Sequence, residues 1–349
     1  MKISVFFAIA LPIVATACSR SQPTPTPVPP TELAAPSPPP ASAAPGPLSS
    51  PPPPSTPARG TCVVVAKLSP WRYGPSVTPL PGGDVLIAGG RQGDDSQFMT
   101  AVDRFDPKTR AIRPAAPLAE ARSLHGAAVA GDGRVVVAGG RTTKAVEVYD
   151  PTANQWSKVG NLGRELVTPI VVALPSGNVL VAGGDLMWKG ALEDKAFEWR
   201  TKAQKLVPIA PMPAGSSGAL VVKLPDGRIG IGADPLNTME EALGEPEILY
   251  DEKAGWLRGK VGDPVIEAIQ KDASGGTLLR PTSHRGPALR LTDDGIQALD
   301  PKGGEWREVA KLERSQPGAT AAMLDDDTAL VAGGIDEEKS LVEICSIAP

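Results

Sequence analysis

A pair of adjacent glycines recurs along this chain at intervals of about fifty residues, and each pair ends a short apolar run. The pairs and the runs before them are Val85–Ala88 with Gly89–Gly90, Val135–Ala138 with Gly139–Gly140, Val179–Ala182 with Gly183–Gly184, and Ala329–Ala332 with Gly333–Gly334. Self-similarity at this period, with strand-like runs between turns, is typical of a propeller. The repeat therefore predicts one architecture for most of the 349 residues.

Further positions keep the same spacing, and together they define six units. One recurring position is tryptophan in three of the units. It lies 27 residues before a glycine pair, or 50 residues from the equivalent position of the next unit. The residues at this position are Cys62, Ile112, Trp156, Leu206, Trp256 and Trp306. In the second unit, strands are expected at 126–130, 134–138, 145–149 and 156–159. The turns between them contain Asp132–Gly133 and Asp150–Pro151, and both dipeptides favour tight reversals. Each unit is thus predicted to be a four-stranded antiparallel sheet.

A glycine pair followed by an aromatic residue and then, seven residues on, by a tryptophan resembles the kelch repeat. The resemblance covers residues 61–349 and implies an all-β, six-bladed kelch-type β-propeller. Two units depart from the pattern, with Ala233–Asp234 and Ser283–His284 in place of the glycine pair. The last unit ends after its third strand, so the strand at 62–66 is expected to close the last blade, because an open edge would otherwise remain unpaired.

The same alignment places two cysteines opposite each other. Cys345 takes the position of Tyr149, and Cys62 takes that of Trp156. Opposite residues of antiparallel strands have Cβ atoms about 4.5–5.5 Å apart, which is close to the separation that a disulfide needs. We therefore expect a Cys62–Cys345 disulfide in an oxidising compartment. The alternative is two buried thiols that serve as small apolar residues.

The N-terminus has the features of an export signal. Residues 1–17 contain Lys2 and an apolar stretch that is too short to span a bilayer. Ala15-Thr16-Ala17-Cys18 resembles a bacterial lipobox, although Ala15 stands where leucine is usual, and the resemblance implies lipidation of Cys18. The alternative is ordinary cleavage, which would give a secreted protein. Ser19 is not the aspartate that retains many lipoproteins at the inner membrane, so the outer membrane is the expected location, on its periplasmic or its outer side.

The segment after the signal is rich in proline. Sixteen prolines lie from Pro23 to Pro57, with few large apolar residues. Such a stretch cannot bury enough apolar surface to fold and favours the extended polyproline II conformation. The predicted domains are therefore a signal peptide at 1–17, a lipidated cysteine with a disordered tether at 18–60, and the propeller at 61–349. The proline-rich segment is alternatively a recognition ligand for another domain.

Composition limits the chemistry of the chain. The net charge of −4 gives no basic field for nucleic acid. Three cysteines, two histidines and three tyrosines leave little material for metal or redox chemistry, so no cofactor and no metal are expected. A kelch-type copper oxidase is excluded because Tyr149 and Tyr250 occupy repeat positions. A kelch-type sugar epimerase or mutarotase remains the alternative function, since its chemistry needs only a few acids, bases and arginines.

Two sets of loops are expected to share one face of the propeller, where the resemblance implies that partners bind. The candidate ligand-binding residues are Trp71, Arg72, Arg122, Arg164 and Arg314 in the first set, Arg91, Arg141, Asp185, Trp188 and Arg285 in the second, and His125 and His284 near the central channel. Tyr73 also lies in the first set of loops, and Asp234 lies in the second. The alternative is a structural role, in which arginines tie blades together and histidines are satisfied in the core. The favoured function is a membrane-tethered module that binds a protein or a glycan, ahead of the epimerase and of a purely structural surface protein.

Overall fold

The computed structural model describes residues 57–93, 97–186, 192–216, 220–224, 226–232, 248–258, 277–279, 289–300 and 305–348. Their contacts place them all in one compact unit, Pro53–Pro349. Every regular element in these ranges is a β-strand. Among the described residues, no helix is long and apolar enough to cross a membrane.

Four separate sheets contain four antiparallel strands each, and consecutive strands lie side by side. The first consists of β2 (Ser76–Pro79), β3 (Val85–Ala88), β6 (Val102–Asp106) and β7 (Ala111–Pro114). The second consists of β8 (Gly126–Val129), β9 (Val135–Ala138), β10 (Ala145–Asp150) and β11 (Gln155–Asn161). The third consists of β12 (Ile170–Ala173), β13 (Val179–Ala182), β14 (Ala196–Arg200) and β15 (Lys205–Ile209). The fourth consists of β16 (Leu220–Lys223), β17 (Ile229–Gly232), β18 (Ile248–Asp251) and β19 (Gly255–Arg258).

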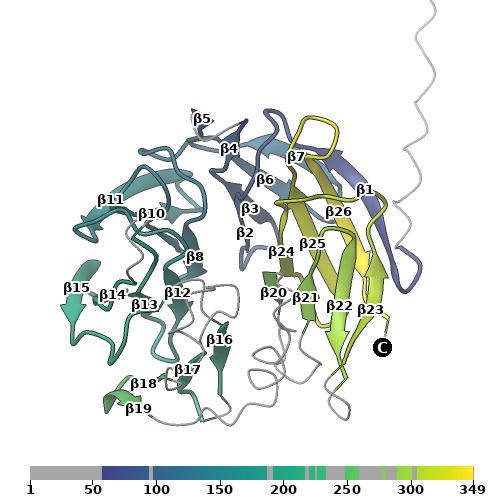
Figure 1. Cartoon of the computed structure of the whole chain (residues 1–349). Coiled ribbons are helices and arrows are strands. Elements are labelled where there is room, and N and C mark those ends of the chain that lie inside the picture. Colours follow the sequence, from purple (N-terminus) through teal and green to yellow (C-terminus); the bar gives the residue numbers. More distant parts are fainter. Residues whose placement is uncertain are drawn as a thin grey trace, which may run out of the picture. The chain divides into compact units, whose positions relative to one another are not determined.

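The fifth sheet has eight strands and joins the two ends of the described chain. Its order is β20 (Thr277–Leu279), β21 (Leu289–Leu291), β22 (Gly295–Leu299), β23 (Trp306–Lys311), β1 (Thr61–Lys67), β26 (Leu341–Ser346), β25 (Thr328–Gly333) and β24 (Thr320–Met323). β1 is antiparallel to β26, with Cys62 opposite Cys345, and it touches β23 through a single parallel pair. Figure 1 shows β1, in purple, beside the yellow β26. The strand at 62–66 therefore completes the C-terminal sheet, as predicted.

The core lies between the faces of successive sheets. The second strands of the first three sheets, β3, β9 and β13, are apolar and buried at every position, because both faces of each strand are covered by neighbouring sheets. The recurring large residue of the third strand is also buried, as Phe105, Tyr149 and Trp199 show. Tyr149 packs in one cluster with Val137 of its own sheet and Leu86 of the preceding one.

The glycine pairs connect neighbouring sheets through the main chain. The Gly90 N–H donates to the Arg122 carbonyl at 2.8 Å. Equivalent bonds run from Gly140 to Leu166, from Gly184 to Ser216 and from Gly334 to Arg72. At Gly89, φ is +65° and an added Cβ would lie 2.6 Å from the Arg122 oxygen. A side chain there would both strain the backbone and separate the two sheets.

Candidate functional site

The loops of both expected sets meet at one end of the first two sheets. The loop from β1 to β2 is held to the loop after β3 by reciprocal main-chain bonds, with Tyr73 N donating to Arg91 O at 2.9 Å and Arg91 N donating to Tyr73 O at 3.0 Å. The loop after β3 contains a small hairpin of β4 (Arg91–Gln92) and β5 (Gln97–Phe98). The predicted sharing of one face by the two loop sets is thus observed for this pair.

Four side chains alternate between aromatic and cationic on this face. The guanidinium carbon of Arg91 lies 4.4 Å from the centre of the Tyr73 ring. In the hairpin, Arg91 stands directly opposite Phe98. The guanidinium carbon of Arg141, from the loop after β9, lies 5.6 Å from the Phe98 ring centre. We call Tyr73, Arg91, Phe98 and Arg141 the aromatic–arginine row, and all four are partly exposed.

The row has a defined chemistry. A guanidinium held over an aromatic face is attracted to the ring and loses little of its capacity to donate hydrogen bonds at its edge. Its planar fork of donors matches a carboxylate, and the rings offer rigid apolar area, which is why arginine and aromatic residues dominate many protein interfaces. The row is therefore suited to a polypeptide that presents acidic and apolar side chains together.

Arg72, one of the expected ligand-binding residues, is instead completely buried. Its guanidinium donates to the carbonyl of Ala101 at 2.9 Å and to the carboxylate of Asp103. Its main-chain N–H donates to the hydroxyl of Ser340 at 3.0 Å. Burial lowers the pKa of Arg72 to about 10. The side chain joins the loop before β2 to β6 of the first sheet and does not contribute to the exposed surface.

Arg122 is buried in the same way. It donates to the carbonyls of Gly139 and Ala145, both at 2.9 Å, and to the carboxylate of Glu147. The other oxygen of Glu147 accepts the Ala119 N–H at 2.7 Å. Burial lowers the pKa of Arg122, while the charge of Glu147 opposes that shift. Arg122 therefore fixes a loop to the second sheet.

The position in the loop explains why the four first-set arginines separate into two groups. Arg72 and Arg122 follow the recurring leucine by four residues, a position that is also buried where Gln316 occupies it. Arg164 and Arg314 follow it by two residues and are exposed. The sequence analysis expected all four on the face where partners bind, and the structure divides them into two buried and two exposed side chains.

The remaining candidates are scattered. The Nε of Arg164 lies 3.9 Å from a carboxylate oxygen of Glu193. Trp71 is partly exposed, and Asp185 bridges Val167 and Leu192 through its main chain. Trp188, His284 and Arg285 lie outside the described residues, as do Asp234 and Cys18.

His125 lies at the junction between the first two sheets. Its Nε2 is 2.9 Å from the Ser76 hydroxyl, and its Nδ1 is buried without a hydrogen-bond partner. Burial, followed by the charge of Arg122, lowers the pKa of His125 to about 3. Between the C-terminal sheet and the first sheet, the Thr320 hydroxyl donates to the Pro75 carbonyl at 2.7 Å. A side-chain hydroxyl thus joins neighbouring sheets at both junctions. His125 is thus a junction residue with a neutral ring.

Phe98 is the member of the row that the sequence analysis missed. The signal in the sequence was the length of the loop, because Phe105 lies sixteen positions after Gly89, while Tyr149 lies ten positions after Gly139. The additional residues carry the β4–β5 hairpin, which presents Arg91 and Phe98 side by side.

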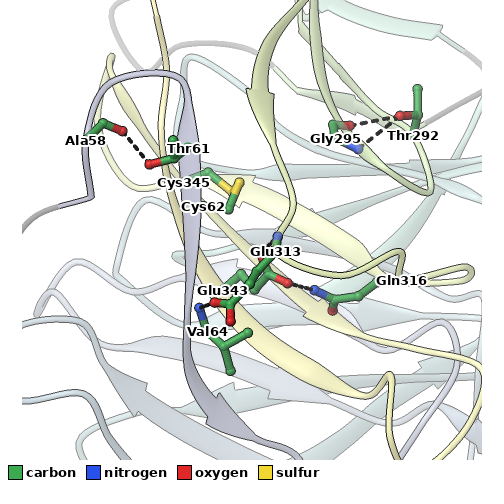
Figure 2. The surroundings of a disulfide bond; sticks show 10 residues. All are labelled: Ala58, Thr61, Cys62, Val64, Thr292, Gly295, Glu313, Gln316, Glu343 and Cys345. Atoms are coloured by element: carbon green, nitrogen blue, oxygen red, sulfur yellow. Dashed lines mark hydrogen bonds between the residues drawn. A yellow bond between two sulfur atoms is a disulfide. The ribbon is translucent and has the colours of Figure 1, made fainter.

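The two cysteines of the repeat form a disulfide between β1 and β26, and both are buried. Figure 2 shows Glu343 close to this bridge. Its carboxylate accepts the Glu313 N–H at 3.0 Å and the Gln316 side-chain amide at 2.5 Å.

Comparisons with known proteins agree with this geometry. The kelch motif matches residues 122–163, a range that runs from Arg122 through the second sheet. The mouse protein Kelch-like protein 40 is 34% identical over 111 residues, which are 31% of this chain and 18% of that protein; the chain thus matches less than a fifth of its relative's length. The structure titled "Structure of YjhT" is similar with a TM-score of 0.53 and 13% identity, over 80% of this chain and 95% of that one. The fold is a β-propeller, and the motif supports a kelch-repeat protein.

Proposed function

We propose that this chain is a membrane-tethered, six-bladed kelch propeller that binds a protein partner through the aromatic–arginine row. The row itself is the observation that supports this function. It lies on loops that the main chain already holds in place, so a partner does not have to order them on binding. Kelch repeats generally mediate protein interactions, which supports a protein as the partner ahead of a glycan.

The sheet topology supports six blades. Four sheets have four strands each, and the eight-stranded sheet consists of two sets of four that meet at one parallel pair between Thr61 and Lys311. Division at that pair gives a fifth blade of β20–β23 and a sixth of β24–β26 with β1. The bond from Gly334 to the Arg72 carbonyl then connects the sixth blade to the first.

The sugar epimerase is less well supported than the binding module. His125 is the histidine within the described residues, and its ring lies at a sheet junction with a pKa of about 3. A group with so low a pKa is a poor general base near neutral pH.

The tether is a proposal from the sequence, because residues 1–56 lie outside the described part. A fatty-acid probe should label the full-length protein in a bacterial host, and Cys18→Ser should abolish both the labelling and the partition into detergent. An unmodified, soluble protein that begins at Cys18 would contradict the anchor without affecting the binding proposal.

Binding is tested by site-specific photocrosslinking in cells. A photoreactive residue at Phe98 should give a discrete protein adduct, while the same residue at Lys108, in the turn between β6 and β7 at the opposite end of the sheet, should not. Arg91→Glu combined with Arg141→Glu should remove the adduct. The control combines Lys108→Glu with Lys202→Glu, which makes the same change in charge in two turns at the end of the sheets away from the row. This control should leave the adduct intact. Equal adducts at both positions, or an adduct that survives the arginine reversals, would exclude the row as the binding site.

A further inference from the structure

We propose that the reduced pair Cys62 and Cys345, together with Glu343, forms a binding site for Zn²⁺ or a similar thiophilic divalent cation. The metal would then replace the disulfide as the link between β1 and β26. The two ends of the propeller would thus have two interchangeable links, one for oxidising and one for reducing conditions.

The geometry of three side chains supports the site. One ligand atom from each of Cys62, Cys345 and Glu343 lies within 4.8 Å of the other two. The cysteines are opposite each other on antiparallel strands. Glu343 precedes Cys345 by two residues on β26, so both side chains are on the same face of the sheet. All three residues are buried, and Figure 2 shows the carboxylate and the sulfur atoms on the same side of β1.

The donor set fits zinc chemistry. Zn²⁺ binds cysteine sulfur at about 2.3 Å and carboxylate oxygen at about 2.0–2.2 Å, so tetrahedral ligands lie roughly 3.3–3.8 Å from one another. Reduction of the disulfide would allow the two sulfur atoms to separate to that distance, and the carboxylate oxygen, which lies within 4.8 Å of both sulfur atoms, would have to move closer to them. Thiolates select Zn²⁺ over Mg²⁺ and Ca²⁺, which prefer oxygen ligands. Three protein ligands leave a fourth position for water.

The surroundings already orient the carboxylate. The Glu313 N–H and the Gln316 amide both donate to Glu343, and such outer partners fix the direction of a ligating group. The amide oxygen of Gln316 is buried without a hydrogen-bond partner.

Exchange of the disulfide for the metal requires reduction before the metal binds. A dithiol reductant supplies two electrons and two protons to the Cys62–Cys345 bond and itself becomes a disulfide. Binding of Zn²⁺ then releases the two thiol protons, because thiolates are the ligands. In the reverse direction, a disulfide oxidant accepts two electrons from the thiolates and, with two protons from water, becomes a dithiol, while the Cys62–Cys345 bond forms again and Zn²⁺ is released.

The test uses the full chain with Cys18→Ser, which removes the third thiol. Co²⁺ is titrated under anaerobic conditions into reduced and into oxidised protein, and Zn²⁺ affinity is measured by competition with a chromophoric chelator. The reduced protein should bind one metal with a thiolate-to-cobalt charge-transfer band, and the oxidised protein should show none. Glu343→Gln should weaken binding by at least about tenfold, while the control Glu308→Gln, at an exposed position of β23, should change it by less than about threefold.

A serine variant and a stability measurement test the site independently of Glu343. Cys345→Ser should lose the band, and Zn²⁺ should raise the melting temperature of the reduced parent but not of this variant. Cys62→Ser takes its place if Cys345→Ser does not fold by circular dichroism. Absence of stoichiometric binding by the reduced protein, or equal binding by the oxidised protein or the serine variants, would overturn the site.

Discussion

The buried ring of His125 should make the protein less stable as the pH falls below about 6.5. The pKa of His125 is lowered to about 3 in the folded protein, whereas an unfolded histidine has a pKa of about 6.5. The unfolded chain therefore binds a proton that the folded protein rejects. The contribution to stability is fully present above the unfolded pKa, decreases as the pH falls through it, and levels off near the folded pKa.

The size of the effect follows from these two values. Between about pH 7.5 and about pH 5.5 the free energy of unfolding should fall by about 1.4 kcal/mol through this residue alone. This change in free energy does not depend on the pKa of His125 in the folded protein, as long as that pKa stays well below about 5.5. His125→Gln removes the titration and retains an amide that can reach the Ser76 hydroxyl, so the pH dependence in this window should decrease by that amount.

The assay is urea unfolding of the parent and His125→Gln at both pH values, at 25 °C. Comparison of the two proteins cancels the carboxylates, such as Glu120 and Asp251, whose lowered pKa values affect both equally. The slope of free energy against denaturant should match between them, so that the midpoints can be compared. An unchanged pH dependence in His125→Gln would refute the burial argument.

Three further substitutions test the packing. Arg122→Ala should lower the free energy of unfolding by about 3–5 kcal/mol, because it leaves the buried Glu147 unpaired; a loss below about 1 kcal/mol in thermal unfolding would contradict the buried pair. Gly89→Ala should destabilise more than Gly83→Ala, since both have positive φ but only Gly89 faces a carbonyl within 4 Å, and equal losses would exclude the steric term. Cys345→Ser opens a loop of 283 residues and should lower the free energy of unfolding by at most about 5 kcal/mol. Hydrogen exchange should become faster in β1 and β26 before the other strands, and uniform exchange across the sheets would contradict this order.

The strands were predictable because their signals are local. The four strands expected in the second unit match β8–β11 within two residues at each end, since the turns at Asp132–Gly133 and Asp150–Pro151 fix where strands stop. The pairing of Cys62 with Cys345 also followed, because it needed only the register of the repeat and not the conformation of a loop.

The site was less predictable because it depends on loop conformation. Whether an arginine is buried or exposed depends on a difference of two residues after the recurring leucine, which separates Arg122 from Arg164. Nothing in the repeat specifies how the chain folds back in that interval. The contact between Arg141 and Phe98 likewise joins two loops of different sheets, and the period of the repeat does not predict contacts between loops.

The reciprocal bonds between Tyr73 and Arg91 have a consequence for how such a propeller can evolve. The two loops are joined by main-chain atoms, which every residue except proline supplies, so the side chains at these positions can be replaced without removing the bonds. Recognition can then diversify while the scaffold stays constant. The buried pair of Arg122 and Glu147 has no such freedom, because a change in one leaves the other charge without a partner. Libraries of new binding specificities should therefore vary the aromatic–arginine row and leave that pair untouched.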